Sequence, residues 1–252
     1  YHDEQLKDDI LYCLEWMYQN RYGEDEIANN ENAWRDHTLT NWYDWQIASP
    51  QALVDIMMLM EEYLTAEQKE NYLKFFRYWV YERCYNSMFS DAGMNALYTA
   101  EIWIGAELLR EGAACAIEAV SALHNTFSWA DNFRTGEGFY TDGSCIFHYK
   151  HPMTSQYGLA QFAASAGILS VLEGTKLEFR NPRKENILDW AIDAFEPLVF
   201  DGAMFRIGGR DHTANNHGKG RQWILGMIDL LDFADSETYN RFGSIIKYMV
   251  NK

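Results

Sequence analysis

The stretch PQALVDIMMLMEEYLTAEQKENYLKFFRYWVYERC, residues 50–84, contains two helical patterns separated by a short polar turn. The first pattern opens with Pro50, which suits the first turn of a helix because a backbone N–H would be unpaired there anyway. The second opens with Thr65, whose hydroxyl can accept a hydrogen bond from the unpaired N–H groups at a helix start. The stretch therefore predicts two helices, over 50–64 and 65–84, joined in a helical hairpin.

The same helical periodicity recurs along the rest of the chain, where apolar residues repeat every three to four positions. No segment shows the sustained alternation of apolar and polar residues that is typical of a strand. The helices expected outside the hairpin cover residues 8–22, 99–111, 114–129, 155–173, 183–197, 219–234 and 236–250. The longer loops between them are 23–49, 86–98, 131–153 and 200–218. The pattern predicts an all-α fold, a single domain over 1–252 that forms an incomplete (α/α) toroid of antiparallel helical hairpins.

The composition is that of a globular protein with an acidic surface. Hydrophobic residues make up 48% and charged residues 23% of the 252 positions, which is ordinary for such a protein. The net charge of −16 argues against nucleic acid as a partner, because phosphate binding requires a basic surface. No run of 18 or more apolar residues is present, so no membrane span is expected. The four cysteines lie far apart without a CxxC pair, which argues against a zinc knuckle and leaves disulfide pairing open.

Two of the loops hold residues that either a core or a sugar site would use. NWYDWQIASP, residues 41–50, places two Trp and a Tyr within four positions. These rings either plug the core, with Asn41 and Asp44 capping helices, or form a platform for the apolar faces of sugar rings. NSMFSDAGMNALYTAE, residues 86–101, places Asn95 just before an expected helix, where Asn is an ordinary cap.

The third loop continues into DGSCIFHYKHPMTSQYG, residues 142–158, in which His148 and Tyr157 lie nine residues apart. Packing is one explanation, because Tyr and His are often half-buried with a satisfied polar tip. Proton transfer is the other, because both side chains can take and give a proton. His148 and His151 have HxxH spacing, but no third ligand stands nearby, so no metal site is expected.

The fourth loop, DGAMFRIGGRDHTANNHGKGR at residues 201–221, is the most cationic region of this acidic chain. Its glycines would let the backbone approach a ligand closely. The charges either face solvent or form a site for an anionic substrate. The basic side chains of this loop are Arg206, Arg210, His212, His217, Lys219 and Arg221.

Together these segments resemble polysaccharide lyase family 8, which includes hyaluronate, chondroitin AC and xanthan lyases. Residues 41–50 resemble the family's NWWDWEIG-P segment, and MNALYTAE resembles its catalytic-asparagine segment. DGSCIFHYKHPMTSQYG resembles its DGSF-QH-----GGYG segment, and GGRDHT its RGR-ISR segment. The chain departs from these patterns where Tyr43 replaces a tryptophan and where Gly208 and Ala214 replace arginines. In addition, TSQYG replaces the glycine pair before the tyrosine. Together these departures bear on the identity of the substrate more than on the type of reaction.

The resemblance implies a lyase site and a reaction. The catalytic group would consist of Asn95, His148, Tyr157 and Arg210. Substrate binding would involve the aromatic patch Trp42, Tyr43 and Phe89, together with Asn41, Trp45, Arg206 and His212. The implied reaction is β-elimination in an anionic polysaccharide that contains uronic acid, giving 4,5-unsaturated products with neither metal nor cofactor. The resemblance also implies a secreted or periplasmic location and a C-terminal β-sandwich region, for which 252 residues leave no room.

Two other functions remain open at this point. A glycoside hydrolase on a similar helical fold would need two carboxylates that face each other across the scissile bond. The candidates are Asp44, Glu137, Asp142 and Asp211, and no pair among them stands out in the sequence. A polysaccharide-binding domain without catalytic activity is favoured by the missing arginine and the short chain. Detection of an unsaturated product would separate a lyase from both alternatives.

Overall fold

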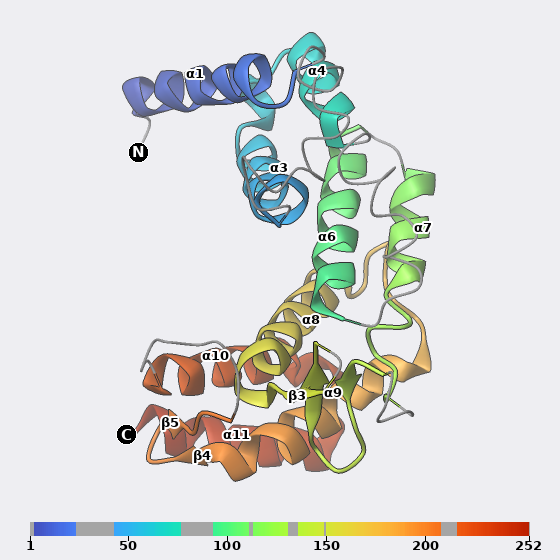
Figure 1. Ribbon diagram of the computed structural model, residues 1–252, viewed down its shortest axis with the longest axis vertical. Helices are drawn as coiled ribbons and strands as arrows, with labels where there is room; N and C mark the ends of the chain where they lie inside the picture. Colours follow the sequence, from blue (N-terminus) through green and yellow to red (C-terminus); the bar gives the residue numbers. More distant parts are fainter. Residues whose placement is uncertain are drawn as a thin grey trace. The chain divides into compact units, whose positions relative to one another are not determined.

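A computed structural model of the chain describes residues 3–23, 43–76, 93–110, 113–130, 136–148, 150–207 and 216–251 (Figure 1). The contacts divide the chain into two compact units. The first unit consists of Tyr1–Met88 and Tyr98–Ala119, and the second of Phe89–Leu97 and Val120–Lys252. The helices α6 (Met94–Leu109) and α7 (Ala113–Ala122) contribute residues to both units. The single domain expected from the sequence stays a prediction.

The helical hairpin predicted over 50–84 is confirmed as far as its residues are described. Its elements are α3 (Ser49–Leu59), a 3₁₀ turn (Glu61–Tyr63) and α4 (Ala66–Phe76). Pro50 lies in the first turn of α3, as predicted. Thr65 Oγ1 accepts a hydrogen bond from the Gln68 N–H (3.2 Å), and the Thr65 N–H donates to Gln68 Oε1 (3.0 Å). This reciprocal pairing satisfies two backbone N–H groups, so the start of α4 is determined locally, whereas positions 77–84 lie outside the described residues.

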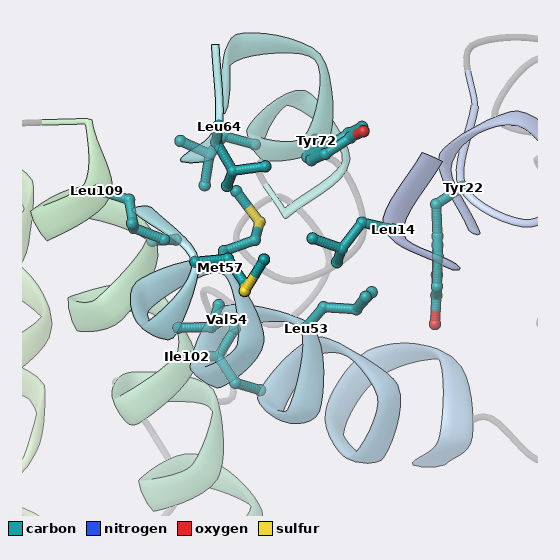
Figure 2. Packing of buried hydrophobic residues seen from close by; sticks show 12 residues of the cluster. Leu14, Tyr22, Leu53, Val54, Met57, Leu64, Tyr72, Ile102 and Leu109 are labelled. Atoms are coloured by element: carbon teal, nitrogen blue, oxygen red, sulfur yellow. The ribbon is translucent and has the colours of Figure 1, made fainter. Parts of the chain in front are cut away.

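Apolar side chains from four helices and the turns beside them form the core of the first unit (Figure 2). The helices are α1 (Glu4–Asn20), α3, α4 and α6. The buried cluster consists of Leu14, Tyr22, Leu53, Val54, Met57, Met60, Leu64, Tyr72, Leu73, Ile102, Ala106 and Leu109. Helices α3 and α6 approach closely because Gly105 has no side chain: a Cβ there would lie 2.4 Å from Val54 Cγ1. The amphipathic periodicity of the sequence therefore buries one face of each of these helices in a shared core.

A carboxyl group is held where α3 and α6 meet. Gln51 Nε2 donates a hydrogen bond to Glu101 Oε2 (3.1 Å). Burial, with the negative charge of Asp55 adding to it, raises the pKa of Glu101 to about 8. The stability of the first unit therefore depends on pH near neutrality.

The second unit packs long helices against one another. Its elements include α8 (Leu159–Leu172), α10 (Asn216–Asp229), a 3₁₀ turn (Leu231–Phe233) and α11 (Ser236–Val250). The short turn sends the chain back, so α10 and α11 lie side by side (Figure 1), which confirms the C-terminal helical hairpin. Asp235 caps α11, since its Oδ1 accepts a hydrogen bond from the Thr238 N–H (2.8 Å). Helices α8 and α10 come close at Gly226, where a Cβ would lie 2.5 Å from Phe162 Cε1.

The helix predicted over 114–129 is shorter than expected, because α7 ends at Ala122. Beyond it, Gln161 Nε2 donates a hydrogen bond to the carbonyl of Thr126 (3.2 Å). Asn186 Nδ2 donates to the carbonyl of Phe127 (2.7 Å). Side chains from later elements therefore satisfy carbonyl groups after the end of this helix.

The helix predicted over 183–197 is a series of short helical turns instead. They are a 3₁₀ turn (Pro182–Glu185), α9 (Asn186–Asp189), a π-helical segment (Trp190–Phe195) and a second 3₁₀ turn (Glu196–Leu198). The buried Trp190 ring stacks on Phe139, with centroids 4.3 Å apart, and on Phe127 at 6.1 Å. Pro197 lacks a backbone N–H and so cannot continue the helical hydrogen-bond pattern. Aromatic packing thus anchors this segment where its helix geometry changes.

The second unit also contains two small sheets. Their strands are β1 (Gly138–Phe139), β2 (Cys145–Phe147), β3 (His151–Pro152), β4 (Val199–Phe200) and β5 (Ala203–Met204). β1, β2 and β3 form one antiparallel sheet in that order, and β4 pairs with β5 across a turn at Asp201 and Gly202, whose φ values are 50° and 80°. The sequence did not indicate these strands, because strands of two or three residues are too short to show an alternating pattern.

Candidate active site

His148 occupies the turn between β2 and β3. Phe147 pairs with His151 across this hairpin, and the His148 carbonyl accepts a hydrogen bond from the Lys150 N–H (2.9 Å). The φ of His148 is 47°, in the left-handed region that costs a residue other than glycine about 1–2 kcal/mol. Its Nε2 is buried and has no hydrogen-bond partner among the described residues. A strained backbone and an unpaired buried nitrogen are features that a purely structural histidine rarely combines.

Tyr157 lies in a π-helical turn (Thr154–Gly158), called the Tyr157 turn below, which leads into α8. The Cys145 N–H donates a hydrogen bond to Thr154 Oγ1 (3.1 Å), which attaches the turn to β2. Gly158 packs closely on the same residue, since a Cβ at Gly158 would lie 3.0 Å from Cys145 Sγ. Burial raises the pKa of the Cys145 thiol, which therefore serves as an apolar contact. These contacts hold the Tyr157 turn on β2.

The two turns bring the side chains of His148 and Tyr157 together. Their ring centroids lie 5.1 Å apart with the planes at 88°, an edge-to-face contact. The Phe147 ring also contacts Tyr157, with centroids 5.3 Å apart. The Tyr157 ring is therefore held by two neighbours. Its hydroxyl group and the adjacent imidazole can both exchange protons.

Asn95 lies in the first turn of α6, and its side chain is exposed. The interpretation of Asn95 as a residue that precedes this helix and caps it was wrong, because α6 begins at Met94. Gly93, just ahead of α6, faces Phe147: a Cβ there would lie 3.4 Å from Phe147 Cε1. The start of α6 therefore lies against the end of β2, beside the turn that holds His148.

Arg206 is exposed in the extended stretch that follows β5. The next residue, Ile207, donates its backbone N–H to Ser155 Oγ in the Tyr157 turn (2.9 Å). A cationic side chain thus stands on the segment that contacts the Tyr157 turn. The following cation of the loop, Arg210, lies outside the described residues, as does His212.

Trp45 lies in a π-helical turn (Asp44–Ala48) of the first unit and packs against its core cluster. Arg21 Cζ lies 4.4 Å from the centroid of the Trp45 ring, a cation–π contact. The Tyr22 ring meets Trp45 edge-on, with centroids 5.1 Å apart. Tyr43 and Trp45 are both half-buried, so each packs on one side and exposes surface on the other.

The predicted site residues thus fall into three groups. The second unit brings His148 and Tyr157 into contact and also holds Asn95 and Arg206. The first unit holds Tyr43 and Trp45. The remaining predicted residues, Asn41, Trp42, Phe89, Arg210 and His212, lie outside the described residues.

A sequence profile described as "Polysaccharide lyase family 8, N terminal alpha-helical domain" matches residues 1–248. The chain belongs to polysaccharide lyase family 8. Family membership and the all-α fold class are therefore confirmed.

Two curated relatives from this family match nearly the whole chain. Xanthan lyase of Bacillus sp. (strain GL1) is 27% identical over 259 residues, which cover 100% of this chain and 26% of that protein. Hyaluronate lyase of Staphylococcus aureus (strain NCTC 8325 / PS 47) is 23% identical over 273 residues, which cover 98% of this chain and 33% of that protein. The chain therefore spans about a quarter to a third of the length of these relatives.

Solved structures from the family share the fold. Paenibacillus xanthan lyase superimposes with a TM-score of 0.81 at 25% identity, covering 98% of this chain and 22% of that one. Chondroitin AC lyase of Streptomyces coelicolor A3, in complex with chondroitin sulphate, gives a TM-score of 0.80 at 23% identity, covering 95% of this chain and 32% of that one.

Asp142, one of the carboxylates considered for a glycoside hydrolase, lies in the turn between β1 and β2. Its Oδ1 accepts hydrogen bonds from the Ser144 hydroxyl (2.6 Å) and the Ser144 N–H (2.9 Å). These bonds hold the pKa of Asp142 below its usual value. The general acid of a glycoside hydrolase needs a raised pKa, so this environment argues against that role for Asp142. Of the other carboxylates considered, Asp211 lies outside the described residues.

The residues that the structure describes include neither a candidate metal site nor a candidate membrane span. No three His, Cys, Asp or Glu side chains gather within it as a metal ion would require. His151, the second histidine of the HxxH pair, is exposed on β3. No helix in the described ranges is long and apolar enough to cross a bilayer.

Sequence analysis did not single out three described residues that contact the predicted site. They are Phe147, Ser155 and Arg21. A signal existed for Ser155, because it stands where TSQYG departs from the family's glycine pair. Arg21 carries no such signal, since its contact with the distant Trp45 forms only in the fold.

Proposed function

We propose that this chain is the helical catalytic domain of a polysaccharide lyase, which cleaves an anionic polysaccharide containing uronic acid by β-elimination. The observation that carries the proposal is the contact between His148 and Tyr157, whose ring centroids lie 5.1 Å apart. Membership of polysaccharide lyase family 8 supports the lyase class. The relatives are named for xanthan and hyaluronate, both anionic polymers, which supports a substrate of that kind.

Tyr157 is proposed to move the proton. After its hydroxyl proton has moved to His148, the Tyr157 oxygen takes the proton from C5 of the uronate, and the electrons of that C–H bond form the C4=C5 double bond. The bond from C4 to the bridging oxygen breaks, and the same hydroxyl returns a proton to that oxygen. No water is consumed, and the product is a 4,5-unsaturated sugar. His148 supports this step, because its buried Nε2 has no partner among the described residues and is available to a substrate or to the tyrosine hydroxyl.

Asn95 is proposed to stabilise the charge that develops on the substrate. As C5 loses its proton, negative charge moves onto the adjacent carboxylate, which becomes enolate-like. An amide N–H that donates to this carboxylate binds it more strongly as the charge grows, and so lowers the barrier. The position of Asn95 in the first turn of α6 adds to this effect, because the amino end of a helix carries a partial positive charge.

The remaining residues are proposed to bind the polymer. Arg206 supplies positive charge for the substrate carboxylate or sulfate, and Arg210 is assigned the same task. Tyr43 and Trp45 expose part of their aromatic surface, which suits the apolar faces of sugar rings. The proposed steps use only side chains of this chain. The secreted or periplasmic location implied by the resemblance stays a prediction.

The test is turnover of a panel of polymers by the full chain, followed through the ultraviolet absorbance of the unsaturated product. The panel contains hyaluronan, chondroitin, alginate, glucuronan and lyase-treated xanthan. Tyr157→Phe should lower kcat by about 10²–10⁴-fold, the usual cost of losing a general acid–base group, with unfolding unchanged. Tyr239→Phe is the matched control, because Tyr239 is exposed on α11. New reducing ends without absorbance would indicate a hydrolase, and near-normal elimination by Tyr157→Phe would contradict the mechanism.

A further inference from the structure

Ser155 stands two residues before Tyr157 and is fully buried. Its Oγ accepts a hydrogen bond from the backbone N–H of Ile207 (2.9 Å), 52 residues further along the chain. Ser155 and Gln156 stand where the family pattern has a glycine pair. The Ser155 side chain therefore makes a contact that a glycine at this position would lack.

The Tyr157 turn is attached to the rest of the second unit on two sides. Thr154 Oγ1 accepts from the Cys145 N–H (3.1 Å) and joins the turn to β2, which leads into His148. The adjacent Ser155 joins the turn to the segment 205–207, which holds Arg206. Neighbouring hydroxyl groups thus connect three of the segments that carry predicted site residues.

Packing alone does not hold the segment 205–207 in place. The side chains of Phe205 and Ile207 are 59% and 37% exposed, so neither is buried in the core. The segment belongs to no helix or strand. The Phe205 N–H donates a hydrogen bond to the carbonyl of Leu198 (2.6 Å), which holds the start of the segment. The hydrogen bond from Ile207 to Ser155 attaches the end of the segment to the Tyr157 turn.

We propose that Ser155 is a positioning residue, which holds the segment 205–207 against the Tyr157 turn so that Arg206 faces the anionic substrate. The inference rests on the proposed lyase function, and it assigns to Ser155 a task in binding, while proton transfer belongs to Tyr157. Because the hydroxyl does not touch the reacting atoms, its loss affects mainly the affinity for the substrate.

The experiment compares Ser155→Ala with Ser165→Ala in the full chain. Ser165 is also fully buried, but its Oγ has no hydrogen-bond partner among the described residues, so its removal deletes the same atom without breaking a bond there. Hydrogen exchange of the Ile207 N–H should be about 3- to 10-fold faster in Ser155→Ala, the scale of one neutral hydrogen bond, and unchanged in Ser165→Ala. KM should rise by about the same factor in Ser155→Ala, with kcat within about twofold of the parent.

Ser155→Gly, which restores the family residue, should behave like Ser155→Ala and serves as the second variant. Unchanged exchange in both variants would overturn this attachment. Faster exchange with an unchanged KM would overturn the positioning role. A fall in kcat as large as the expected rise in KM would overturn it as well. If the parent chain turns over none of the polymers, the proposed function itself has failed. An active parent with a normal KM in both variants would refute only the role of Ser155.

Discussion

Replacing His148 by glycine should give a more stable protein than replacing it by alanine, although both variants should be inactive. The φ of His148 is 47°, a conformation that costs a residue with a Cβ about 1–2 kcal/mol. Glycine avoids this cost but loses about 0.5–1 kcal/mol through the greater freedom of its unfolded chain. Both variants lose the ring contact with Tyr157, so that contribution cancels. The glycine variant should therefore be more stable than the alanine variant by about 0.5–1 kcal/mol.

The assay is thermal and urea unfolding of the two variants, with activity measured in parallel. A difference of that size corresponds to about 1–4 °C in Tm for a protein of this length. Asp201 offers the matched control, because its φ is 50° and it lies exposed in the β4–β5 turn. Asp201→Gly should exceed Asp201→Ala in stability by a similar amount, with activity retained.

Two results would refute the reasoning. If His148→Ala is as stable as His148→Gly while the Asp201 pair differs, the His148 backbone carries no strain. If either His148 variant keeps normal turnover, the imidazole lies outside the active site, and the strain has another origin.

Three further predictions concern the packing at Gly226, the pH dependence of stability and the Trp45 side chain. Gly226→Ala should cost about 1–3 kcal/mol in urea unfolding because its Cβ would meet the Phe162 ring, whereas Gly167→Ala, which meets nothing within 4 Å, should be neutral or slightly stabilising. The free energy of unfolding should fall as pH rises from about 4.5 to about 8, by at most about 1.4 kcal/mol per pH unit, because folded Glu101 holds its proton and the unfolded chain releases it. Glu101→Gln should flatten that profile, and an unchanged slope would contradict the assignment. Trp45→Ala should lower stability by about 2–3 kcal/mol through lost core contacts and should also raise KM, whereas unchanged stability would show that the ring does not support the core.

Local sequence signals predicted the helices best where each end has its own cap. Thr65 and Asp235 begin α4 and α11 through hydrogen bonds to backbone N–H groups three residues later, so both starts are decided within one turn. The start of α6 was misplaced, and Asn95 was therefore taken for a residue that precedes the helix. The irregular segment around Trp190 was also misread, because its geometry changes where rings from distant positions pack on it.

The sequence by itself determined the all-α class, because periodicity and caps are properties of neighbouring residues, and its resemblance to family 8 singled out His148 and Tyr157. Only the tertiary structure decided that the two rings touch, since His148 follows a strand of three residues and Tyr157 lies in the π-helical turn before α8, and neither element is specified by a local pattern. The bond from Ile207 to Ser155 likewise has no local origin, because it joins residues 52 positions apart. It depends on segments that meet only when the chain folds, so it follows from a long-range contact rather than from the residues beside it.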